Sequence, residues 1–403
     1  MKHVVFVIGH YKNGGVPMRA TNLANELGRR GYRVTILVTK EIGKEIFFEL
    51  QENVKLISLA KFVEETRDNQ KILDDRIKRE KQLHNCKRMR YLSRYFPKWD
   101  RELAHRVRSI RIGELLRVYM LLNPDALYIP FGLAYYEETF CAAEKLSCKI
   151  IYAERNAPEL EMPKDRDKAS RLLKMLGQAN GAVFQTRDEQ RFYEKVINNN
   201  VVVIHNPIKN NLPKPYIGER RKVIVNFCRV APQKNLKLLI DSFAKLHKDH
   251  EDYLLEIYGN TVEDSEELLC DELKKYVLTL NLDRYVKILP PVADVHNKVR
   301  DCVMFVSSSD FEGLSNSMIE AMAIGLPCVC TNCLGGGARE VIENEKSGLI
   351  VPINDVDALY NGMKRMIEDV ELARRCGENA TRIRGEQSVE KIVDQWIEVI
   401  ESA

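Results

Sequence analysis

The stretch Val4–Val38, VVFVIGHYKNGGVPMRATNLANELGRRGYRVTILV, decides the fold class of this chain. It opens with the continuous apolar run Val4–Ile8, which predicts a strand buried on both faces. A glycine-rich loop follows, and Pro17 is placed as in the first turn of a helix, which ends at Gly31. The run Val34–Val38 predicts a second strand. The order of strand, glycine loop, helix and strand is that of a βαβ unit in a parallel sheet.

The same alternation continues in two halves of the chain. Residues 206–221 are rich in Pro, Asn and charge and predict a linker between the halves. Residues 61–122 are long, polar and helix-like, and they predict an insertion, because a crossover between strands normally needs one helix and short loops. Further apolar runs predict strands at Val54–Leu59, Ala126–Ile129, Lys149–Tyr152, Ala182–Gln185, Val201–Ile204, Val223–Phe227, Leu254–Tyr258, Val286–Leu289, Val303–Val306, Pro327–Thr331 and Gly348–Val351.

Bulk composition is that of a globular protein. The chain has 403 residues, of which 45% are hydrophobic and 30% charged, enough for two or three domains with their own cores. No apolar stretch approaches the roughly 18 residues that span a bilayer. The first residues carry no secretory signal pattern, and the ten cysteines are scattered. We therefore expect a cytoplasmic protein that does not cross a membrane.

A basic block distinguishes residues 76–111 from the rest of the chain. It contains 13 Lys and Arg against three Asp and Glu, a net charge of +10, so that the remainder carries −6. Aromatic residues such as Tyr91, Phe96 and Trp99 lie among the cations. This mixture favours an anionic membrane surface, on the inner face of the cell membrane, or a lipid pyrophosphate as partner. A solvated helical hairpin is the alternative, and we expect no nucleic acid because no known nucleic-acid motif accompanies the block.

The strongest chemical signal lies in Ser307–Thr331, SSSDFEGLSNSMIEAMAIGLPCVCT, which follows a predicted strand. Seven residues separate Glu312 from Glu320, and Gly313 between them allows close backbone approach before the next helix. Free N–H groups at the start of that helix suit a phosphate. Glu320, one turn into the helix, is placed to accept two hydrogen bonds from a ribose diol. A capped helix with a solvated acid is the alternative interpretation.

A second signal opens the second half of the chain, in the stretch Asn226–Asn235, NFCRVAPQKN. Arg229 and Lys234 both lie in the predicted loop from strand to helix, on the side where parallel sheets bind ligands. An arginine offers a planar fork of donors and a lysine a mobile point charge, so the two together suit a diphosphate. Two solvated surface cations are the alternative.

These segments resemble the retaining glycosyltransferases of family 4, also called group 1. A Glu–x7–Glu motif and an upstream Arg and Lys characterise the donor site of that family. The resemblance implies the GT-B fold, an α/β fold in which two Rossmann-like domains face each other across a cleft. It covers nearly the whole chain and includes Gly14–Gly15, AERNAP at Ala153–Pro158, HNPI at His205–Ile208, GGAREVIENEKSGLIVPIND at Gly336–Asp355, and the C-terminal helix with Trp396.

The family likeness also implies a division of the chain. Residues 1–207 would form the acceptor domain, with the basic helical insertion at 61–122. Residues 208–387 would form the domain for the nucleotide-sugar donor. Residues 388–403 would form a helix that packs back on the N-terminal domain.

Roles for individual residues follow from the same likeness. Arg229 and Lys234 would bind the donor diphosphate and stabilise it as leaving group, and Glu312 would contact the sugar, so these three are the candidate catalytic residues. The expected donor-binding residues are Gly14, Gly15, Gly313, Leu314, Ser315, Asn316, Ser317 and Glu320. Further contacts in the cleft are expected from His10, Glu154 and Arg155.

The expected reaction is a retaining transfer of a hexose or N-acetylhexosamine. The donor would be a nucleotide sugar, a UDP-sugar in our interpretation, and the acceptor a lipid-linked glycan of a bacterial surface polysaccharide such as a capsule. Fixed cations stabilise the departing phosphate and can replace a metal ion, so we expect no metal and no other cofactor. Neither the two Asp-x-Asp triplets nor the Cys328–Cys333 run forms a convincing metal site.

Two alternatives remain open from the sequence. A sugar-nucleotide epimerase can share this two-domain architecture. An inactive binding subunit is the other alternative, because Cys228 stands where the family usually has Gly. In addition, Tyr128–Gly132 lacks the His that many members carry after the fourth strand.

Overall fold

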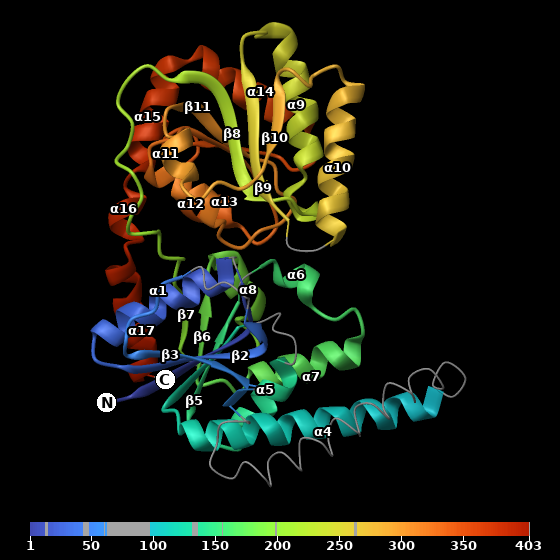
Figure 1. The fold of residues 1–403 in the computed structure, drawn as a ribbon, viewed down its shortest axis with the longest axis vertical. Helices are drawn as coiled ribbons and strands as arrows, with labels where there is room; N and C mark the ends of the chain where they lie inside the picture. Colours follow the sequence, from blue (N-terminus) through green and yellow to red (C-terminus); the bar gives the residue numbers. More distant parts are fainter. Residues whose placement is uncertain are drawn as a thin grey trace.

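The computed structural model describes residues 1–12, 15–42, 48–59, 61–62, 97–130, 136–154, 156–197, 200–261 and 264–402. Two α/β domains follow one another, each built around one parallel sheet (Figure 1). This confirms the predicted fold class. Among the described residues, no helix is both long and apolar enough to span a membrane.

The first domain contains a seven-stranded sheet with the spatial order β3-β2-β1-β4-β5-β6-β7 in the described part of the chain. Its strands are β1 (His3–Tyr11), β2 (Arg33–Ile42), β3 (Val54–Ser58), β4 (Ala126–Pro130), β5 (Lys149–Ala153), β6 (Gly181–Phe184) and β7 (Val201–Val203). Its helices are α1 (Gly15–Arg29), α4 (Pro97–Leu122), α5 (Tyr136–Ala143), α6 (Pro158–Glu161), α7 (Arg166–Leu176) and α8 (Arg187–Tyr193).

The second domain contains a six-stranded sheet with the order β10-β9-β8-β11-β12-β13 in the described residues. Its strands are β8 (Arg221–Arg229), β9 (Leu254–Asn260), β10 (Val286–Leu289), β11 (Cys302–Ser307), β12 (Cys328–Thr331) and β13 (Leu349–Val351). Its helices are the short 3-10 helix η1 (Pro232–Lys234), α9 (Leu236–Asp249), α10 (Asp264–Thr279), α11 (Val295–Val299), α12 (Asn316–Ala323), α13 (Gly337–Val341), α14 (Val356–Glu368), α15 (Val370–Ala380) and α16 (Ile383–Glu386).

Each sheet is covered by helices on both faces, which explains the uninterrupted apolar runs of its central strands. In the first sheet, alternate residues of β1 enter different cores: Val5 and Val7 pack with α4, α5 and α7, and Phe6 and Ile8 pack with α1. In the second sheet, one core includes residues of α9 and α14 and the other includes residues of α12 and α16.

The strand order reverses at one place in each sheet, between β1 and β4 and between β8 and β11. Loops after such neighbouring strands run in opposite directions and leave room for a ligand at the carboxyl edge of the sheet. Arg229 ends β8, and the loop that contains Glu312 follows β11. The two strongest sequence signals therefore meet at the switch point of the second sheet.

The chain crosses between the domains twice. Residues 204–220 form the first crossing and contain neither helix nor strand. The final helix, α17 (Val389–Ser402), then runs back along the first domain and packs beside α1 (Figure 1). The two crossings touch, because the backbone N–H of Ile208 donates to the carbonyl of Gln387 at 2.9 Å.

The predicted insertion at 61–122 is described only in part. Residues 97–122 form α4, which packs against α5. Residues 63–96, which include most of the basic block at 76–111, lie outside the described residues. At the end of the block, Arg108 pairs with Glu137 at 2.9 Å and Arg111 with Glu138 at 4.0 Å, so part of the positive charge is balanced within the domain.

Trp396 provides a test of how α17 contributes to stability. Its buried ring packs edge-on against Tyr128 of β4, with ring centroids 5.3 Å apart. We expect Trp396→Ala to lower the free energy of unfolding by about 3–5 kcal/mol, because the cavity would lie inside the first domain. Urea denaturation measures the change, with the exposed neighbour Glu398→Ala as control. Equal unfolding midpoints for the two variants would contradict a role of α17 in that core.

Candidate active site

The loop after β8 carries both predicted cations on a fixed backbone. Asn235 has a left-handed conformation with φ of 41°, and its side-chain oxygen accepts from the N–H of Leu238 to cap α9. Its amide also donates to Asp310 at 2.7 Å. Asparagine tolerates this conformation better than most residues and is a good helix cap. The turn therefore holds Lys234 against the loop that follows β11.

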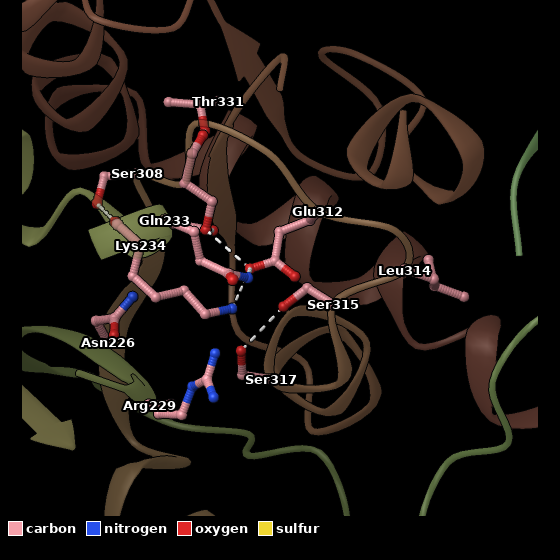
Figure 2. A network of polar contacts seen from close by, with 12 residues as sticks. Asn226, Arg229, Gln233, Lys234, Ser308, Glu312, Leu314, Ser315, Ser317 and Thr331 are labelled. Atoms are coloured by element: carbon pink, nitrogen blue, oxygen red, sulfur yellow. Dashed lines mark hydrogen bonds and ion pairs between the residues drawn. The ribbon is translucent and has the colours of Figure 1, made fainter. Parts of the chain in front are cut away.

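Lys234 and Glu312 form an ion pair at the centre of the site (Figure 2). Their side chains are only 13% and 14% exposed. The same Glu312 oxygen accepts from Gln233 at 3.1 Å and from Ser309 at 3.4 Å. Burial would lower the pKa of Lys234, but the negative charge of Glu312 outweighs it and raises that pKa. Lys234 is therefore a permanent cation whose charge is neutralised by a carboxylate.

Arg229 lies opposite this pair, with its guanidinium group pointing into the same space as the amine of Lys234 (Figure 2). Its Nε lies 3.3 Å from an oxygen of Glu266 on α10, whose side chain is only 6% exposed. The arginine side chain itself is 43% exposed. A partner at Nε leaves the two terminal nitrogens directed away from it, which is the face that binds an anion through two donors.

The loop Gly313–Ser317 approaches the next loop of the domain very closely. A Cβ atom on Gly335 would lie 2.0 Å from the carbonyl oxygen of Glu312, and one on Gly337 would lie 1.9 Å from that of Gly313. Only glycine therefore fits at either position. The hydroxyls of Ser315 and Ser317, 3.1 Å apart, lie beside Arg229 and Lys234 at the start of α12 (Figure 2).

Glu320 lies one turn into α12 and is nearly buried. Its Oε2 is 2.8 Å from Nε2 of His296 on α11, and its Oε1 is 3.4 Å from Nζ of Lys209 in the first crossing. A buried carboxylate needs such partners, because its charge loses the solvation of water. The residue that we expect to bind ribose thus has a partner on each oxygen.

Asn206 joins the loop Gly313–Ser317 to the first domain. Its side-chain oxygen accepts from Arg19 of α1 at 3.0 Å and from Gln185 at 2.8 Å. Its side-chain nitrogen donates to the carbonyl of Leu314 at 2.9 Å and to the side chain of Asn316 at 3.0 Å. All four hydrogen-bonding positions of a buried amide are therefore used, two toward each domain.

Gln185 completes this junction from the end of the first sheet. Its side-chain oxygen accepts from the backbone N–H of Leu314 at 3.0 Å. That N–H is among the groups expected to hold the donor phosphates, and in this structure it is occupied by the first domain. Nearby, Thr186 donates to the carbonyl of Gly335 at 2.6 Å, and Asp188 pairs with Arg339.

The residues of the first domain that we expect to contact the ligand lie in different environments. Gly14 and Arg155 lie outside the described residues. Gly15 is the first residue of α1. His10 is the last residue but one of β1, at the carboxyl edge of the sheet. Glu154 is only 1% exposed, and its Oε2 accepts from the hydroxyls of Tyr152 and Tyr193 at 2.8 Å each. Its carboxylate is thus enclosed by first-domain side chains.

A second buried acid, Glu189 of α8, lies near Glu154. One of its oxygens accepts from the N–H of Gln185 at 2.6 Å, and the other has no hydrogen-bond partner among the described residues. Burial, and secondarily the charge of Glu154, raise the pKa of Glu189 well above its ordinary value. This acid is therefore held protonated more strongly than a solvated glutamate.

Several thiols of the second domain have a raised pKa because they are removed from water. Cys228, which replaces the glycine usual in the family, lies beside Lys234, and burial raises the pKa of its thiol to about 11. Burial likewise raises the pKa of Cys333 to about 12 and that of Cys328 further. Within the described ranges, no three His, Cys, Asp or Glu side chains gather as metal ligands would.

Comparison with known proteins shows which family the second domain matches. Residues 208–383 match the family model of the glycosyl transferases group 1. The second domain of this chain therefore matches the group 1 glycosyltransferases. That match spans the second domain, with both crossings at its borders, and contains Arg229, Lys234, Glu312 and Glu320. The enzyme is therefore a glycosyltransferase, as its sequence predicts.

Relatives of this glycosyltransferase extend over both domains. An uncharacterized glycosyltransferase of Haemophilus influenzae is 24% identical to this chain. The similarity covers 98% of this chain and 99% of the length of that protein. The N-acetylgalactosamine-N,N'-diacetylbacillosaminyl-diphospho-undecaprenol 4-alpha-N-acetylgalactosaminyltransferase of Campylobacter jejuni is 33% identical, over 42% of this chain and 43% of its own. Staphylococcus aureus TarM has the same fold, with a TM-score of 0.76 at 14% identity over 99% of both chains, and a TarM mutant has been solved with UDP. This likeness establishes the GT-B fold of the glycosyltransferase.

Several site residues could not be found from the sequence of the glycosyltransferase. Glu266, His296 and Lys209 contact predicted residues but belong to no motif. Asn206 lies in the HNPI segment, which is part of the family resemblance but implies no role for this residue. Gln185 ends a predicted strand, so the sequence places it at the carboxyl edge of the sheet. No other sequence pattern singles it out.

Asn206→Ala tests the junction between the domains. Removal of the amide takes one hydrogen-bond partner from each of Arg19, Gln185 and the Leu314 carbonyl, and we expect a loss of roughly 2–4 kcal/mol in the free energy of unfolding. Urea denaturation followed by tryptophan fluorescence measures the loss. Asn210→Ala, at an exposed position of the same crossing, is the matched control. A loss no larger than that of the control would mean that the amide contributes nothing to the junction.

Glu189 should make stability depend on pH. Above the ordinary glutamate pKa of 4.5, the unfolded chain releases a proton that the folded chain keeps, so the free energy of unfolding falls as pH rises toward the folded pKa. Glu189→Gln removes this dependence. We expect the stability of the wild type relative to the variant to fall by roughly 1–3 kcal/mol between pH 4.5 and 8. Exposed Glu194→Gln is the control, and a pH-independent difference for Glu189→Gln would refute the assignment.

Proposed function

We propose that this group 1 glycosyltransferase moves a hexose or N-acetylhexosamine from a UDP-sugar to a lipid-linked glycan. The transfer would retain the anomeric configuration and need no metal ion. The acceptor would belong to the synthesis of a bacterial surface polysaccharide. The enzyme would act in the cytoplasm, at the inner face of the membrane.

The observation that carries this proposal is the pairing of both cations with carboxylates at the carboxyl edge of the second sheet. Lys234 pairs with Glu312 and Arg229 with Glu266, beside the glycine loop and the start of α12. A diphosphate would replace these carboxylates as the anionic partner of the two cations. When Lys234 turns to the phosphate, Glu312 is released to accept a hydrogen bond from the donor sugar.

The proposed chemistry uses these charges as the bond breaks. The bond between the anomeric carbon and the diphosphate oxygen is cleaved, and the acceptor hydroxyl oxygen bonds to that carbon on the same face. The hydroxyl proton passes to the departing phosphate oxygen. Negative charge on the diphosphate grows during this step, so fixed cations stabilise the transition state more than the bound donor. Arg229 and Lys234 would supply this stabilisation.

The nature of donor and acceptor rests on the relatives and on charge. TarM has been solved with UDP, and the Campylobacter relative is named for a diphospho-undecaprenol acceptor. The basic block at 76–111 carries a net charge of +10, which suits the diphosphate of such a lipid and the anionic surface that holds it. Both points support a lipid-linked acceptor.

Lys234→Ala tests the function directly. Purified enzyme is incubated with UDP-sugars in the presence of EDTA, and with acceptor sugars either linked to a lipid diphosphate in anionic vesicles or free of lipid. We expect transfer by the wild type to the lipid-linked acceptor, and a kcat roughly 10²–10³-fold lower for Lys234→Ala, because a charge that stabilises the leaving group is lost.

Lys237→Ala is the matched control for this experiment. Lys237 lies three residues after Lys234, in the first turn of α9. It is exposed and pairs with Asp241 at 2.7 Å. Equal transfer by the Lys234 and Lys237 variants would refute the role of Lys234. Turnover of a UDP-sugar to its epimer without acceptor would refute transfer, and activity that EDTA abolishes would refute the metal-independent reaction.

A further inference from the structure

His296 lies on an element that takes no part in the donor-site motifs. It belongs to α11, which lies beside α12 in the second domain (Figure 1). Its ring is buried and meets Phe227 of β8 edge-on, with centroids 5.5 Å apart and an interplanar angle of 83°. Phe227 in turn packs on Phe305 of β11. The imidazole is therefore held in place by aromatic packing between two central strands.

The direction of the hydrogen bond between His296 and Glu320 follows from their chemistry. Nε2 of His296 lies 2.8 Å from Oε2 of Glu320. An ionised carboxylate only accepts hydrogen bonds, so Nε2 carries the proton and donates it. Hydrogen bonds to an ionised group are stronger than those between neutral groups. The rigid ring thus fixes the carboxylate of Glu320 by a strong bond.

Glu320 keeps acceptor capacity beyond this bond. A carboxylate has about four lone-pair positions. Its bonded neighbours among the described residues are His296 on Oε2 and Lys209, 3.4 Å from Oε1. Each oxygen therefore retains a position for another donor. Two neighbouring hydroxyl groups, as in a ribose, are matched to a carboxylate whose orientation is fixed, whereas a free glutamate side chain would have to be ordered on binding.

We propose that His296 is a positioning residue that orients Glu320 toward the two ribose hydroxyls of the donor nucleotide. His296 thereby sets the preference of the enzyme for ribonucleotides over 2′-deoxyribonucleotides. The inference rests on the proposed function, because it takes the ligand of Glu320 to be the ribose of a nucleoside diphosphate. His296 acts through Glu320 and need not touch the ligand.

The test compares the binding of ribonucleotides and deoxyribonucleotides. Isothermal titration calorimetry gives the Kd of the full-length protein for UDP and for 2′-deoxy-UDP, and likewise for the GDP and ADP pairs. We expect the wild type to prefer the ribonucleotide, and His296→Phe to reduce that preference about tenfold, as for loss of one charge-assisted hydrogen bond. Phenylalanine keeps the ring packing on Phe227 but cannot donate to Glu320.

Two further variants separate positioning from a general effect on folding. His296→Gln restores an N–H donor at a similar distance from the backbone and should recover most of the preference. In a Glu320→Gln background, His296→Phe should change the preference no further, because the two residues act as one unit. His250→Phe, which alters a histidine paired with Glu368 at 3.3 Å elsewhere in the domain, is the matched control.

The outcomes distinguish this inference from the proposed function. A preference unchanged in His296→Phe, or reduced equally in both backgrounds, would overturn the role of His296. A wild type that transfers sugar but binds ribonucleotides and deoxyribonucleotides equally would overturn the inference and leave the transferase intact. A wild type that neither binds a nucleoside diphosphate nor transfers sugar would overturn both. Loss of the preference for ribonucleotides in His296→Phe, with recovery in His296→Gln, would establish the positioning role of His296.

Discussion

The side-chain amide of Asn206 is the contact on which the geometry of the site depends. It receives hydrogen bonds from α1 and from Gln185 after β6, and it donates two to the loop Gly313–Ser317. A buried amide with all its partners in place is rigid, because any displacement leaves a polar group unsatisfied. The position of the Leu314 backbone is thus decided jointly by both domains.

Charge pairing is the second organising principle of the site. The enzyme holds Arg229, Lys234, Glu312 and Glu320 near one another without leaving any of these charges alone. An unpaired buried charge would cost several kcal/mol. Internal partners that an anionic ligand can replace keep the free enzyme stable. They also keep the cations ionised and in position, so little reorganisation accompanies binding.

The sequence predicts the fold well because each structural signal is local. Parallel strands covered on both faces appear as apolar runs, and the Val4–Ile8 and Val34–Val38 runs lie within β1 and β2. The pairing of Lys234 with Glu312 agrees with a motif that places both at the same edge of one sheet. The strand ends differ by up to four residues, since apolar runs do not record where hydrogen bonding stops.

Other parts of the site depend on contacts that no local pattern records. His296 precedes Glu320 by 24 positions, and Gln185 precedes the residue whose N–H it accepts by 129. Only the packing of α11 on α12, and of one domain on the other, brings these pairs together. The enclosure of Glu154 by Tyr152 and Tyr193 is likewise a result of packing, because a polar residue after a strand is as well placed to face a ligand as to turn inward.

The double crossing of the chain makes the second domain an insertion within the first domain rather than an addition to its end. Its borders meet where Ile208 bonds to Gln387, and α17 completes the core of the half that precedes it. Exchange of this domain between related genes would therefore require two recombination points rather than one. In the descent of such enzymes, α17 belongs with the first domain, although it is encoded on the far side of the second.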